Sequence, residues 1–171
     1  MLALQIKLNE DDARRAEELL GRLADKAEDL PGALGQIGEG LLNNTHDRFD
    51  SQTDPQGKPW APLSGLTVAV RGESGPILRV SGRLRGSVSY QVSGNILRIG
   101  PNAPPYDAVH QFGARITPKK GKALKVPGPG GGFLSLSAVN IPARPYIGFG
   151  LKDEETTRDA VEEWLEMEGM E

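Results

Sequence analysis

The stretch Tyr106-Asp-Ala-Val-His-Gln-Phe-Gly113 is the one from which we work out the fold. Its bulky apolar residues Tyr106, Val109 and Phe112 recur at three-residue spacing, which predicts a short helix with these side chains on one face. Gly113 suits the position just past the end of that helix. His110, on the same short helix, is a candidate interface residue together with Tyr106 and Phe112.

A second stretch, Ile141-Pro-Ala-Arg-Pro-Tyr-Ile-Gly148, is dominated by its prolines. Pro142 and Pro145 each lack a backbone donor and have a fixed φ, so they hold the residues between them extended. The sequence therefore predicts Arg144 on a rigid segment with Tyr146 beside it, ready for a contact between subunits. The alternative for Arg144 is an internal structural pair.

Regular elements are predicted before these stretches. Alternation of apolar and polar residues over 2–8 is typical of a half-buried strand, and Asn9 followed by acidic residues is a typical helix start. Pro31 suits the first turn of a second helix. One face of that helix carries Leu34, Ile37, Leu41, Thr45 and Phe49. Its glycines indicate close packing against the first helix or a neighbouring subunit; they are Gly32, Gly35, Gly38 and Gly40.

Further elements follow along the chain. Residues 54–57 are predicted to form a turn, and Ser64 and Ser81 to cap two short helices. Residues 87–92 and 96–99 predict a hairpin. Residues 116–118 and 133–137 are expected to be the arms of a second hairpin, and the last helix, from Asp153 to Met167, has a strongly acidic outer face.

The tip of that second hairpin is rich in lysine and glycine. Residues 117–132 have a composition that cannot bury enough apolar surface to order itself, so we expect a flexible arm. Its lysines can face DNA or an acidic neighbour, such as the terminal helix of the next subunit; they are Lys119, Lys120, Lys122 and Lys125.

These elements predict an α+β fold in a single domain, residues 1–171, with a tail at about 166–171. N-terminal helices pack on a small antiparallel sheet of hairpins, followed by a C-terminal helix. Trp60 lies between two prolines and is either a core residue or an exposed interface anchor.

The composition supports a modest core. The chain has 171 residues, of which 37% are hydrophobic, with 22 glycines and 13 prolines. We therefore expect neighbouring subunits to complete part of the fold. Charge is unevenly distributed: residues 71–125 carry net +8, whereas residues 1–70 carry −5 and residues 126–171 carry −6. Such division indicates either pairing within the chain or faces of opposite sign.

Residues with the patterns of catalytic chemistry are not found in the sequence. There is no cysteine, which excludes disulfides and thiolate sites, and His46 and His110 have no partner at ligand spacing. Nucleophile-elbow, phosphate-loop and dinucleotide motifs are absent. We therefore expect a non-enzyme with no catalytic residues, cofactor or metal. No signal peptide or membrane-spanning run is expected either.

Five sequence blocks in order carry a resemblance to a known family. They are residues 44–49 (NTHDRF), 54–64 (DPQGKPWAPLS), 77–84 (ILRVSGRL), 106–113 and 141–148. Together they resemble the phage virion morphogenesis family, which comprises tail-completion or neck proteins of long-tailed phages, including Mu-like ones. The resemblance covers roughly residues 2–165, but the insert at 114–140 has no recognisable family content.

The resemblance implies a structural protein of the virion neck or tail, assembled in the cytoplasm of the bacterial host. It implies an α+β fold, a hexameric ring of the chain with itself, and tail completion or head–tail joining. Adjacent partners would be the tail terminator, the tail tube and the head-completion protein, with DNA passing through the lumen. The alternative is a stand-alone nucleic-acid-binding module that uses the basic region 71–125.

Overall fold

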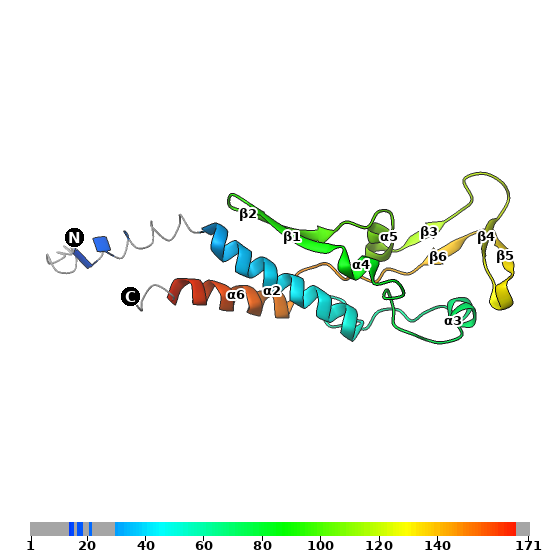
Figure 1. Cartoon of the computed structure of the whole chain (residues 1–171), viewed down its shortest axis with the longest axis horizontal. Coiled ribbons are helices and arrows are strands. Elements are labelled where there is room, and N and C mark those ends of the chain that lie inside the picture. The colour runs from blue at the N-terminus through cyan, green and yellow to red at the C-terminus, as the bar shows by residue number, and fades with distance from the viewer. Residues whose placement is uncertain (1–13, 16, 19–20, 22–29, 167–171) are drawn as a thin grey trace, which may run out of the picture.

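The computed structural model describes residues 14, 15, 17, 18, 21 and 30–166. The strand predicted at 2–8, the start of the first predicted helix at Asn9 and the tail beyond residue 166 lie outside the described residues. Within them the molecule is elongated and α+β, with two long helices at one end and a β arm at the other (Figure 1).

The longest helix that lies wholly within the described residues is α2, Leu30–Ser51. Its buried residues include Ala33, Ile37, Thr45 and Phe49, which confirms the predicted helix and much of its apolar face. Helix α6, Leu151–Glu166, runs alongside it (Figure 1).

Two glycines of α2 mark its close contacts. A Cβ at Gly38 would collide with the Tyr90 ring on strand β1 (Val88–Ser93), and one at Gly40 would collide with Thr156 on α6. The prediction that these glycines pack against the first helix or a neighbouring subunit is therefore wrong for both, because their partners are strand β1 and helix α6 of the same chain.

The first predicted hairpin is confirmed. Strand β1 pairs antiparallel with β2, Ile96–Pro101, from Val88 opposite Pro101 to Ser93 opposite Ile96. Two short helices precede it, α3 (Gly65–Arg71) and α4 (Arg83–Gly86). The hydroxyl of Ser64 accepts a hydrogen bond from the Thr67 amide at 3.2 Å, so it caps α3 as expected.

The second predicted hairpin is paired differently. Strand β3 (Ala114–Ile116) pairs with β6 (Val139–Ile141), and β4 (Leu124–Pro127) pairs with β5 (Phe133–Leu136) across the short 3-10 turn η1 (Pro129–Gly131). The prediction that residues 116–118 pair with 133–137 is wrong. The reason is an apolar row hidden in the lysine-rich segment: Leu124 and Val126 lie opposite Leu136 and Leu134, and such cross-strand pairs stabilise a sheet.

We call residues 114–141 the arm. It points away from α2 and α6, and its β4–β5 end lies near α3 (Figure 1), which contacts η1. Within the arm, residues 117–123 belong to no helix or strand.

The core is small and lies where the elements converge beside the C-terminal half of α2. It consists of Phe49, Trp60, Leu84, Val88 and Tyr146. The ring of Phe49 meets Trp60 edge-on at 5.6 Å between centroids and Tyr146 at 5.2 Å. Trp60 is thus a core residue, and its Nε1 donates to the Pro145 carbonyl at 2.8 Å.

Candidate interaction site

Helix α5, Tyr106–Phe112, is held in place by polar groups. The Gln111 amide accepts from the backbone N of Tyr146 and of Ile147, both at 3.1 Å, and donates to the Ile147 carbonyl at 2.7 Å. The Tyr146 hydroxyl donates to the Asp107 carbonyl at 3.2 Å. One glutamine side chain therefore docks the helix onto the extended segment 144–147.

The end of α5 is fixed by its glycine, as predicted. Gly113 has φ +74°, and a Cβ there would lie 2.8 Å from the Ala143 nitrogen and 2.9 Å from the Ile141 oxygen. The Arg144 amide donates to the His110 carbonyl at 2.8 Å. The two stretches that opened the sequence analysis are therefore packed backbone to backbone.

Two of the three bulky apolar side chains of α5 are exposed. Tyr106 is 59% exposed and Phe112 is 77% exposed, whereas Val109 is half-buried. No residue of α5 is fully buried: its inner side carries half-buried polar side chains with Val109, and its two aromatic rings are exposed. Tyr106 and Phe112 are accordingly the predicted interface residues that are available to a partner.

Three other predicted interface residues lie inside the chain. Trp60, Arg144 and Tyr146 are all buried. The guanidinium group of Arg144 is hydrogen-bonded within the chain: Nε donates to the Ala61 carbonyl and Nη2 to the Pro62 carbonyl, both at 2.8 Å. Burial, and secondarily Asp107, raises the pKa of Tyr146 to about 12. The expectation that Arg144 is presented to another subunit is replaced by its internal alternative.

The His110 side chain is half-buried, between the exposed and the buried members of the predicted set. Burial lowers its pKa below 6.5, and the nearby positive charge of Arg144 lowers it further. Its Nδ1 is buried and has no hydrogen-bond partner among the described residues. The neutral imidazole is therefore the favoured form in the folded chain at neutral pH.

A polar cluster that the sequence analysis missed joins α2 to α6. Arg48 forms a buried ion pair with Asp153, which also accepts from Asn44 Nδ2 at 3.2 Å and from the Gly150 amide at 2.8 Å. The block of residues 44–49 contained two of these side chains. The only further signal was the acidic start of the last helix, and nothing in the sequence pairs positions that lie about a hundred residues apart.

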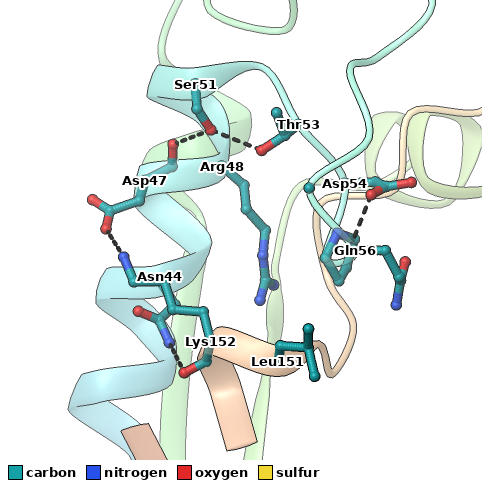
Figure 2. Close-up of a pocket in the computed structure, with 11 residues that line it drawn as sticks. Asn44, Asp47, Arg48, Ser51, Thr53, Asp54, Gln56, Leu151 and Lys152 are labelled. Atoms are coloured by element: carbon teal, nitrogen blue, oxygen red, sulfur yellow. Dashed lines mark hydrogen bonds and ion pairs between the residues drawn. The ribbon is translucent and has the colours of Figure 1, made fainter. Parts of the chain in front are cut away.

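Beside this cluster lies a cavity of about 460 Å³. Figure 2 shows its walls, with α2 and residues 53–57 facing Leu151 and Lys152. Its charged side chains are bonded within the chain: Lys152 pairs with Asp47 at 2.6 Å, Arg48 pairs with Asp153, and Asp54 accepts from the Gln56 and Lys58 amides. We interpret this cavity as a gap between packed elements and not as a ligand site, because its polar groups already bind one another.

The four arm lysines are exposed. Lys119, Lys120 and Lys122 lie in the 117–123 loop, and Lys125 lies on β4. In the described part of the chain, no cluster of three or more His, Cys, Asp or Glu side chains is arranged to hold a metal ion. None of the described helices combines the length and hydropathy needed to cross a bilayer.

Comparison with known proteins identifies the class. The sequence model of the phage virion morphogenesis family matches residues 11–166. The chain belongs to this family, and its role is structural, as a component of the phage virion. No curated protein and no solved structure matches the chain.

Proposed function

We propose that this chain completes the phage tail at the neck, where it forms a ring that lets tails join heads. Two findings support the proposal together: membership of the virion morphogenesis family, and a helix, α5, built with its aromatic side outward. The second finding carries the connector role, because exposed aromatic rings near rigid backbone are typical anchors of protein interfaces.

The rigidity of that helix supports the assignment. Gln111 and Tyr146 fix α5 from its inner side, so Tyr106 and Phe112 lose little further backbone freedom when a partner covers them. The partners we propose are the neighbouring copy and the adjacent neck or tail proteins: the tail terminator, the tail tube or the head-completion protein. DNA passing through the ring is the remaining proposed neighbour.

Electron microscopy of particles made without this protein tests the function. We expect filled heads and complete-length tails that remain separate, and joining should be restored when purified protein is added. Joined particles in its absence would show that the protein acts elsewhere in the virion. Heads that lose their DNA while tails form normally would instead assign it to head completion.

The exposed lysines of the arm favour a second candidate, a nucleic-acid-binding module. Two of the arginines that this candidate requires are engaged within the chain: Arg79 and Arg85 both pair with Asp50, at 2.6 and 3.5 Å. A gel-shift experiment with purified protein decides between the candidates. Tight and strongly salt-dependent DNA binding would favour the module, and weak binding would favour the connector.

A further inference from the structure

An open groove runs between α2 and α6 at the helical end of the molecule. It has a volume of about 460 Å³ and is lined by Gln36, Glu39, Gly40, Thr156, Asp159, Ala160 and Glu163. Three of these residues are carboxylates and none is basic. Gly40 contributes to its shape, because the missing side chain lets Thr156 approach the α2 backbone.

The arm at the other end has the opposite charge. Lys119, Lys120, Lys122 and Lys125 lie within seven residues of one another and are all exposed. No ion pair joins any of the four to a described residue. The arm therefore presents four ammonium groups, and the groove presents three carboxylates.

The two surfaces are too far apart to meet within one chain. In Figure 1 the α2–α6 pair occupies one end of the long axis and the arm occupies the other. Complementary surfaces at opposite ends of one subunit can meet between copies in a head-to-tail arrangement, and such contacts close into a ring when the rotation between copies allows it.

We propose that the α2–α6 groove of one copy binds the lysines of the arm of the next copy. The inference rests on the proposed ring and names the contact that builds it. Because both surfaces are exposed in the single chain, the contact depends on salt, since ions screen such charges. The rigid β4–β5 pairing places Lys125 on a fixed strand, while the 117–123 loop lets the other three lysines adjust to the carboxylates.

Zero-length carbodiimide cross-linking tests this contact, because it joins a lysine to a carboxylate only when the two touch. Purified full-length protein, half of it labelled with ¹⁵N, is cross-linked at low salt and its peptides are identified by mass spectrometry. We expect mixed-label links between the arm lysines and Glu39, Asp159 or Glu163, and their loss at high salt. Links within one chain only, or none from the arm to the groove, would overturn the proposal.

Charge reversal makes the test sharper. An arm variant has the four lysines changed to glutamate, and a groove variant has Glu39→Lys, Asp159→Lys and Glu163→Lys. Each alone should lose the links. An equimolar mixture should recover them and assemble with the two variants alternating, because the acidic arm then fits the basic groove and the unchanged basic arm fits the unchanged acidic groove. Continued self-association of the groove variant to wild-type extent would contradict the proposed contact.

The matched control lies on the same helix. Glu154, Glu155 and Glu162 are exposed on α6 outside the groove, so changing them to lysine alters the net charge equally and should leave the links intact. Melting temperatures confirm that each variant is folded. If the arm variant still forms rings but fails to retain DNA, the lysines face DNA and the groove contact is wrong. Tail completion is judged separately, from particles that lack the protein.

Discussion

Arg48 on α2 and Asp153 in the first turn of α6 form a buried ion pair that connects two distant parts of the sequence. Arg48 also donates to the carbonyls of Tyr146 and Gly148, both at 3.2 Å. The Asp153 carboxylate accepts from the Gly150 amide at the start of α6, as the acidic member of a capping box does. A single pair thus fixes the helix start, the 146–148 segment and α2 together.

We expect Asp153→Ala to lower the free energy of unfolding by about 3–5 kcal/mol, because it leaves Arg48 buried without its counter-charge. Chemical denaturation measures the loss. The control is Glu155→Ala, an exposed carboxylate on the same helix, which should change stability by no more than about 0.5 kcal/mol. Equal effects of the two substitutions would show that the ion pair is unimportant to the fold.

Arg144 should serve the fold of the single chain. Arg144→Ala removes the donors for the Ala61 and Pro62 carbonyls, and we expect a loss of about 1–3 kcal/mol in the free energy of unfolding. Arg144→Lys should recover only part of it, because an ammonium lacks the planar fork. A variant with unchanged melting temperature but no particle yield would instead support the assembly role first predicted from the sequence.

Tyr106 and Phe112 should behave in the opposite way. Because both are exposed, Tyr106→Ser with Phe112→Ser should change the free energy of unfolding by no more than about 0.5 kcal/mol, while the yield of joined particles falls at least tenfold. Val80→Ser is the control, since Val80 is 72% exposed and lies outside α5. Normal yield from the double variant would remove α5 from the interface.

His110 should make the fold sensitive to acid. Its folded-state pKa lies below 6.5, so the unfolded chain takes up the proton first as pH falls. The contribution of neutral His110 to stability is complete above pH 6.5 and is lost as pH falls through the folded-state pKa. In His110→Gln, the decrease of melting temperature below pH 6.5 should be shallower than in the wild-type protein. If melting temperature decreases equally with pH in both proteins, His110 takes up no proton on unfolding.

The parts of the fold that follow from local pattern were predictable. The apolar spacing of α2, the Ser64 cap, the β1–β2 hairpin and the Gly113 helix end are all properties of a few neighbouring residues. The strand pairing of the arm was predicted wrongly, because the composition of the arm suggested disorder. The apolar alternation of Leu124 and Val126 within it is short and lies among lysines. A two-residue apolar row becomes informative only when its cross-strand partners are known.

The site was harder to predict, because burial is a tertiary property. An arginine between two prolines, such as Arg144, can bind a partner or its own chain equally well. The position of the Ala61 and Pro62 carbonyls in the fold determines that Arg144 binds within the chain. The aromatic side of α5 was correctly located on one helix, but its outward orientation depends on Gln111 binding the 146–147 backbone. Arg48 and Asp153 are separated by too many residues for any local pattern to join them.

A reconstruction of the neck of the intact virion tests the proposed ring and the contact that builds it. We expect several copies of this chain in a closed ring at the head–tail joint, with the arm of each copy in the α2–α6 groove of the next. A well-resolved map that shows the chain in one copy per particle, or away from the joint, would contradict it.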